Sequence, residues 1–398
     1  QSRSQAARPM KLGTRLAQKG RRASSNPGTV NLPVARASTV TFATLAQMQS
    51  VQARFEADEV VPTYGIANMP LRAAFEELMV EIEGGHRAVT LPSGLAAVAV
   101  ALMACLKAGD HLLMTDSAYG PARRFCTRTL ARYGVETTFY DPLVGAGIAG
   151  LMKPNTRAVY LESPGSLTFE VQDFPAIAKV ARERGAAVLH DNTWATGIFF
   201  RSFDHGADLV IQAATKYPAG HSDVLIGAVV ANEAWWPALR DAARDLGQTA
   251  SPDDLFLTLR GIRTLETRLK RHETSAIQIA QWLNAHPAVK RVLHPALPED
   301  PGHALWKRDF LGSAGLIGVE LAACTQEQLA ALVEPLECFA LGYSWGGYES
   351  LIVPANLRGA RSVRPWQGGP LLRLQIGLED PADLVADLAK GFDRMKDA

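Results

Sequence analysis

Short apolar runs alternate with longer segments of helical periodicity between residues 71 and 231. Continuous apolar runs predict buried strands, and apolar positions that recur every three to four residues predict helices. The predicted strands are 86–91, 111–115, 135–140, 157–162, 187–190, 209–212 and 226–231. The predicted helices are 71–83, 95–106, 121–133 and 175–184. Strands separated by helices form right-handed βαβ units, so the pattern predicts an α/β fold with a mainly parallel sheet.

A long helical pattern from about residue 253 to 285 separates this region from a second α/β region, which ends in a predicted helix at 381–395. The chain has 398 residues and exceeds one ordinary domain. We therefore expect an N-terminal arm (1–63), a large domain (64–255) and a smaller C-terminal α/β domain (256–398).

Composition narrows the possible partners. A net charge of +1 gives no general field for nucleic acid. The longest uncharged apolar run, 95–106, is too short to cross a bilayer, so no membrane partner is expected. Four cysteines without paired metal spacing indicate free thiols in a reducing cytoplasm, and the nine histidines include no His-x-x-x-His pair. No metal site is expected.

The first fifty residues carry eight Lys or Arg and no acidic residue. Such a start is typical of an organelle transit peptide, and also of an arm that packs on a neighbouring subunit. No apolar segment of the secretory kind follows these charges. We favour the arm.

Lys216 stands in a turn-rich stretch (214–223) directly after the predicted strand 209–212. A lysine there can simply extend its amine to solvent. It can also be a desolvated amine of lowered pKa that forms a Schiff base. Position alone leaves both interpretations open.

Two glycine-containing turns are similar to anion-binding motifs, and only the first keeps that interpretation. Gly94 and Leu95 open an uncharged helix after a strand, where backbone N–H groups and the helix dipole favour a phosphate; a plain strand–helix turn is the alternative. The stretch 145–150 matches G-x-G-x-x-G, but Pro154 ends the segment before a full helix can form. Dinucleotide binding is therefore rejected.

Two charged residues occupy strand positions that favour ligand contact. Asp191 follows an apolar strand, where ligands of α/β sheets gather, although a turn or N-cap aspartate is equally possible. Arg373 lies inside an apolar run and needs a paired anion, either a structural carboxylate or that of a substrate. A lysine, an anion-binding turn, an aspartate and an arginine together are what a pyridoxal phosphate (PLP) enzyme acting on amino acids requires.

Longer strings support this interpretation. They are LESPGSLTFEVQDFPAI (161–177), DNTWATGIFF (191–200), IQAATKYPAGHSDVLIG (211–227), YSWGGYESLI (343–352) and LLRLQIGLED (371–380). In this order they resemble the Cys/Met-metabolism family of PLP-dependent enzymes from about residue 30 onward, and within it the β-lyase branch. The resemblance implies the type I aminotransferase-like fold and a homotetramer built as a dimer of dimers.

The resemblance also implies roles for individual residues. Lys216 would form the Schiff base and exchange protons with the substrate, with Tyr119 and Tyr64 as further catalytic candidates. The implied cofactor contacts are Gly94, Leu95, Tyr119, Asp191, Thr215 and, from a neighbouring subunit, Tyr64. The implied substrate contacts are Arg373, Tyr343, Ser344 and Trp345.

The implied activity is C–S β-elimination of L-cystathionine to homocysteine, pyruvate and ammonia, a step of methionine biosynthesis. Other β-substituted thioether amino acids remain possible substrates. The alternatives are a γ-type relative (γ-lyase, γ-synthase or methionine γ-lyase) and a PLP-binding protein without turnover. The second is motivated by Ile66, which stands where the family usually has an arginine at the cofactor phosphate; Arg72 is a nearby candidate to compensate.

Overall fold

The computed structural model of this chain describes residues 10–21, 28–357 and 359–398. Its larger sheet has seven strands in the spatial order β1-β7-β6-β5-β4-β2-β3. They are β1 (Arg87–Leu91), β2 (His111–Thr115), β3 (Glu136–Tyr140), β4 (Thr156–Glu162), β5 (Ala187–Asp191), β6 (Leu209–Gln212) and β7 (Gly227–Ala231). The pairings from β3 through to β6 are parallel, whereas β7 runs antiparallel to both β6 and β1. The expected mainly parallel α/β sheet is confirmed.

Helices cover both faces of this sheet because alternate strand residues point to opposite sides. On β5, Val188 packs into one apolar cluster, whereas Ala187 and Leu189 pack into another. The helices of the first face are α3 (Pro70–Glu83), α6 (Phe174–Glu183) and α7 (Thr196–Phe199), and those of the second are α4 (Gly94–Cys105), α5 (Gly120–Arg124) and α8 (Trp236–Asp245). The sheet thereby forms the middle layer of three.

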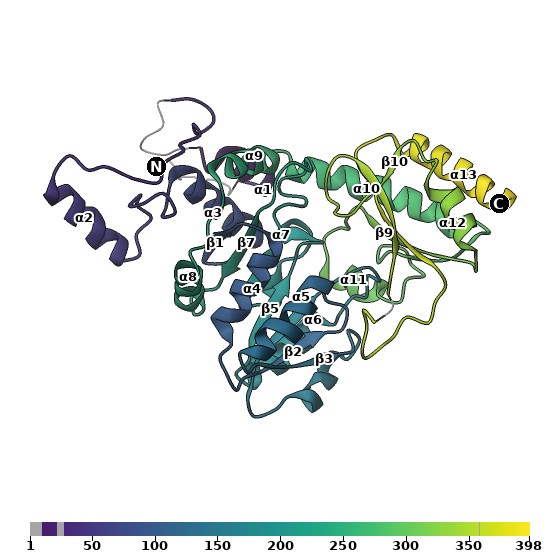
Figure 1. Ribbon diagram of the computed structural model, residues 1–398, viewed down its shortest axis with the longest axis horizontal. Coiled ribbons are helices and arrows are strands. Elements are labelled where there is room, and N and C mark those ends of the chain that lie inside the picture. Colours follow the sequence, from purple (N-terminus) through teal and green to yellow (C-terminus); the bar gives the residue numbers. More distant parts are fainter. Residues whose placement is uncertain (1–9, 22–27, 358) are drawn as a thin grey trace, which may run out of the picture.

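A smaller sheet of five strands, in the order β10-β11-β12-β9-β8, follows in the sequence. Its strands are β8 (Val289–Leu293), β9 (Leu316–Leu321), β10 (Phe339–Leu341), β11 (Ser350–Ala355) and β12 (Leu371–Gln375). The helices α10 (Leu265–Asn284), α12 (Gln326–Val333) and α13 (Pro381–Asp397) share an apolar cluster with it. The long α10 runs from the larger sheet's side of the molecule to the smaller sheet (Figure 1).

The N-terminal region reaches away from this body. Helix α1 (Leu12–Gln18) buries Leu16 and accepts hydrogen bonds from Arg263 near its end. Helix α2 (Leu45–Glu56) buries none of its side chains and projects outward at the left of Figure 1. The arm expected here, which would contact a neighbouring subunit, stays a prediction.

Most predicted elements are present with small shifts at their ends. Two differ in kind. The predicted helix 121–133 contains a π-helical turn (Phe125–Leu130) after α5, and the long helical pattern from 253 divides into α9 (Pro252–Ile262) and α10. Short helices complete the chain: η2 (Gly145–Leu151), η3 (Ser202–His205) and α11 (His303–Asp309). Across the described ranges, no helix combines the length and apolar character needed to cross a membrane.

Candidate active site

A cavity of about 440 Å³ lies where β4, β5 and β6 end, between the larger sheet and the strands of the smaller one. Ligands of open α/β sheets bind at this edge, and the volume suits a small cofactor with its substrate. Ten predicted site residues line the cavity: Gly94, Leu95, Tyr119, Asp191, Thr215, Lys216, Tyr343, Ser344, Trp345 and Arg373.

Lys216 reaches into this cavity from the turn after β6. Its Nζ donates a hydrogen bond to Ser344 Oγ at 2.5 Å and lies 5.2 Å from the ring centre of Trp345. Burial lowers the pKa of this amine to about 8, and the positive charge of Arg373 contributes, whereas Asp191 opposes the shift. A lysine in this state has a larger neutral fraction near neutral pH than an ordinary lysine, which favours nucleophilic and proton-transfer chemistry.

The turn that carries Lys216 is held by its neighbour. The Thr215 hydroxyl donates to the carbonyl of Ile226 and accepts from the Ile226 N–H. Gly346 packs against the same turn, with φ of +89° and room for no side chain, since a Cβ there would lie 3.0 Å from Lys216 Cα. Thr215 thus lines the cavity, but its hydroxyl is engaged with the backbone, and its predicted phosphate contact stays a prediction.

Asp191 ends β5, the strand next to β6, and lines the same cavity. Its carboxylate accepts hydrogen bonds from the N–H and hydroxyl of Thr193 and from the hydroxyl of Tyr160. Burial raises the pKa of Asp191, and these donors together with Lys216 oppose the rise. The charged form of such a buried carboxylate is stabilised by a cationic partner such as a protonated ring nitrogen.

The start of α4 provides an anion-binding surface. Ser93 caps the helix by accepting from the N–H of Ala96, which leaves the N–H groups of Gly94 and Leu95 outside the helical hydrogen-bond pattern. A side chain at Gly94 would collide with Ala213, because its Cβ would lie 2.5 Å from the Ala213 Cβ. Glycine therefore allows the helix end to approach the turn after β6.

Arg373 enters from the middle of β12. Its Nη2 donates to the Ser344 carbonyl at 2.8 Å, while its buried Nε has no hydrogen-bond partner among the described residues. Burial lowers its pKa. Ser344 has a positive φ of 72°, a conformation that costs energy and often occurs at functional sites. Through Ser344 the structure joins Lys216 and Arg373, which are far apart in the sequence.

Tyr119 covers the mouth of the cavity. Its ring is about half exposed, and its backbone N–H donates to Glu162 Oε2 at 2.6 Å. Burial raises the pKa of its phenol, and the charges of Asp191 and Glu162 add to the rise. Tyr343 lies at the same mouth and is 86% exposed.

Tyr64 is not part of this cavity. It lines a separate hollow of about 330 Å³ together with Ile66 and Arg72, and it is 54% exposed. Arg72 forms an ion pair with Glu76 at 2.8 Å and also donates to the carbonyl of Ile66. Its charge is therefore already balanced within the chain, which argues against Arg72 as the replacement for an arginine at position 66.

Sequence reasoning missed Glu162, which lines the same cavity. A signal was present, because Glu162 ends the apolar strand β4 just as Asp191 ends β5. The two residues are direct partners in the strand register.

The chemistry of the cavity fits PLP with an amino acid. Lys216 supplies an amine of lowered pKa, Asp191 a buried carboxylate, the α4 terminus a place for phosphate, and the Arg373 guanidinium a donor for a carboxylate. In the described parts of the chain, no group of acidic, histidine or cysteine side chains is arranged to hold a metal ion.

Known proteins are similar to this chain over nearly its whole length. The family model described as Cys/Met metabolism PLP-dependent enzyme matches residues 13–393. A putative cystathionine beta-lyase of Rhizobium johnstonii is 46% identical over 96% of both chains. The cystathionine beta-lyase MetC of Escherichia coli is 44% identical and covers 97% of this chain and 99% of its own. The solved structure of cystathionine gamma synthase from Xanthomonas oryzae pv. oryzae, in complex with aminoacrylate and cysteine, has a TM-score of 0.89 at 32% identity, covering 98% of this chain and 100% of its own.

Proposed function

The chain belongs to the Cys/Met metabolism family of PLP-dependent enzymes, and from this premise we propose that it is a carbon–sulfur lyase of the cystathionine β-lyase type. The reaction consumes L-cystathionine and water and releases homocysteine, pyruvate and ammonia. It serves methionine biosynthesis. The β-lyase relatives are 40–46% identical to this chain, whereas the γ-synthase is 32% identical, so β-elimination is preferred to γ-chemistry.

One observation carries the proposal: the Lys216 amine lies inside the cavity, hydrogen-bonded to Ser344, with its pKa lowered to about 8. An amine that loses its proton so readily can accept the Cα proton of an amino acid and later release it. Bound PLP supplies an electron sink for the pair left at Cα.

The other residues position the substrate around this amine. Arg373 would bind the α-carboxylate through its guanidinium group, and Ser344 orients the Lys216 amine. After Lys216 has taken the Cα proton, the Cβ–S bond breaks and Lys216 returns a proton to the departing sulfur. When PLP is bound, Asp191 would support positive charge on its ring, and Tyr119 would contact the cofactor from the cavity lining.

The γ-type alternative is disfavoured by the aromatic residue beside the amine. Relatives with γ-chemistry usually have a leucine where this chain has Trp345, whose ring centre is 5.2 Å from Lys216 Nζ. This ring restricts the space next to the reacting carbon, as suits a substrate that loses its sulfur at Cβ.

Product analysis tests the proposed function. Purified protein with bound PLP is incubated with L-cystathionine, and the sulfur and keto-acid products are identified. Homocysteine with pyruvate is expected. Cysteine with 2-oxobutyrate would establish γ-chemistry instead, and a PLP-loaded protein that yields no product from any thioether amino acid would establish the non-catalytic alternative.

We extend the proposal to assembly and location. The unburied α2 and the exposed Tyr64 favour a homotetramer in which each arm completes a neighbour's cofactor site. The three parts expected from the sequence (1–63, 64–255 and 256–398) serve as arm, cofactor domain and C-terminal domain. All four cysteines are unpaired, in keeping with work in the cytoplasm.

A further inference from the structure

Two carboxyl groups meet at the edge of the sheet that faces the cavity. Glu162 and Asp191 are the last residues of β4 and β5 and are register partners, so their side chains leave the sheet side by side. Two neighbouring buried carboxylates repel each other, and such a pair keeps a proton on one member. The proton resides on the carboxyl group whose charged form is stabilised less by hydrogen-bond donors and positive charges.

Hydrogen-bond donors distinguish the two. Asp191 accepts from Thr193 twice and from Tyr160, and it is also attracted by Lys216. Among the described residues, the side-chain carboxyl of Glu162 accepts one hydrogen bond, from the N–H of Tyr119 at 2.6 Å. The negative charge is therefore better supported on Asp191.

The charged groups around Glu162 lead to the same conclusion. Burial raises its pKa well above the ordinary range and the charge of Asp191 adds to the rise, whereas the Tyr119 N–H and Arg361 oppose it. Arg361 comes from the connection between β11 and β12, and its guanidinium donates to Ser166 and Thr168. Its hydrogen bonds are thus directed away from Glu162.

We propose that Glu162 is a positioning residue: its neutral carboxyl group fixes the backbone of Tyr119 over the cavity and leaves Asp191 as the charged carboxylate beside the cofactor. The inference rests on the proposed function, since it takes Tyr119 and Asp191 as cofactor contacts. Glu162 acts through Tyr119 and not on the reacting atoms.

Three variants test this. Glu162→Gln keeps a neutral acceptor for the Tyr119 N–H, so PLP affinity and the pH profile of bound-PLP absorption should stay within about twofold of the parent. Glu162→Leu has similar volume but no acceptor, and the unpaired N–H should weaken PLP binding about tenfold. Glu136→Gln changes an exposed carboxylate on β3 and serves as the matched control, with no expected effect.

The dissociation constant of PLP and its absorption between pH 6 and about 9 are the readouts. Equal losses of PLP affinity in Glu162→Gln and Glu162→Leu would overturn the proposal of a neutral carboxyl group. Binding would then require a negative charge at Glu162. Parent-like binding in Glu162→Leu would overturn the positioning role.

If Glu162→Leu fails to fold, Glu162→Asp replaces it, because a carboxyl shorter by one methylene cannot reach the Tyr119 N–H. Weaker PLP binding by Glu162→Asp supports the proposal, and parent-like binding overturns it. These readouts follow the cofactor and not the product, so a failed β-elimination assay leaves the test of Glu162 intact.

Discussion

At the scale of single residues, burial lowers the pKa of the Lys216 amine. Lys216 is partly buried and lies near Arg373, and both features favour its neutral form. The position of this lysine after a strand could be predicted from the sequence, but the proximity of Ser344 and Arg373 could not. That proximity arises from packing the smaller sheet against the larger one, which no local pattern encodes.

The lowered pKa predicts how the cofactor-free protein captures PLP. Because the neutral amine is the reactive form, the rate of capture should rise with pH and level off above about 8. Arg373→Leu removes a neighbouring positive charge, so the pKa of Lys216 should rise and the rate profile should move to higher pH. Stopped-flow absorption of PLP across pH measures this. An unchanged profile would contradict the assigned influence of Arg373.

Arg373 should also matter for the substrate. Its loss removes a charge-assisted contact to the α-carboxylate, and kcat/KM for cystathionine should fall about 10- to 100-fold. Steady-state kinetics of Arg373→Leu checks the expectation. Arg271→Leu is a suitable control, because this exposed arginine donates to the carbonyl of Glu379 and lies outside the cavity lining.

Secondary-structure elements were largely predictable where strands are apolar throughout. The ranges 111–115 and 209–212 agree with β2 and β6, because buried parallel strands appear as continuous apolar runs. The π-helical turn after α5 was not predictable, since nothing in Phe125–Leu130 breaks the helical pattern. The reversed direction of β7 was also missed, because strand direction depends on the connection and not on the strand's own residues.

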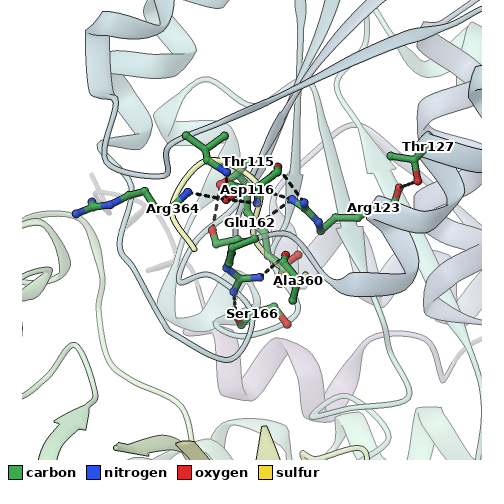
Figure 2. A network of polar contacts seen from close by, with 12 residues as sticks. Thr115, Asp116, Arg123, Thr127, Glu162, Ser166, Ala360 and Arg364 are labelled. Atoms are coloured by element: carbon green, nitrogen blue, oxygen red, sulfur yellow. Dashed lines mark hydrogen bonds and ion pairs between the residues drawn. The ribbon is translucent and has the colours of Figure 1, made fainter. Parts of the chain in front are cut away.

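The contact between Asp116 and the loop before β12 leads to a specific prediction for stability. Asp116, fully buried after β2, accepts hydrogen bonds from Ser362, Val363 and Arg364 and pairs with Arg123 at 2.8 Å. Figure 2 shows this network joining the loop before β12 to the larger sheet. Asp116→Asn should lower the free energy of unfolding by about 2–4 kcal/mol.

The pH dependence of this effect follows from the pKa of Asp116. Burial would raise it, but the hydrogen bonds from Ser362 to Arg364 outweigh burial and hold it below the ordinary value. The stabilisation is therefore present above the unfolded pKa of about 4 and is lost as pH falls through the lower folded value. Thermal unfolding at neutral and acidic pH tests this. Asp204→Asn, at an exposed ion pair, should change stability little.

At the scale of the whole molecule, the projecting α2 is a part of the arm that a single chain leaves unburied. Helix α2 buries no residue, and Leu45 and Met48 are largely exposed. Exposed apolar side chains on a projecting helix favour a protein partner. The basic composition of the first fifty residues suggested an arm, but only the structure shows how far α2 stands from the body.

Assembly should depend on this helix. Replacing Leu45 and Met48 with Glu places charges in the expected interface, so the protein should dissociate from a tetramer to smaller species. Light scattering after size-exclusion chromatography measures the mass. Leu311→Glu, at an exposed leucine after α11, is the control and should remain assembled. A parent protein that is already monomeric would contradict the arm's role.

The central claim is that Lys216 breaks a C–S bond at Cβ. The ratio of pyruvate to 2-oxobutyrate released from L-cystathionine tests it most directly, measured for the parent protein and for Lys216→Ala, both supplied with PLP. The account predicts pyruvate in equal amount to homocysteine from the parent protein and at least about a thousandfold less from Lys216→Ala. Release of mainly 2-oxobutyrate, or full pyruvate production by Lys216→Ala, would contradict it.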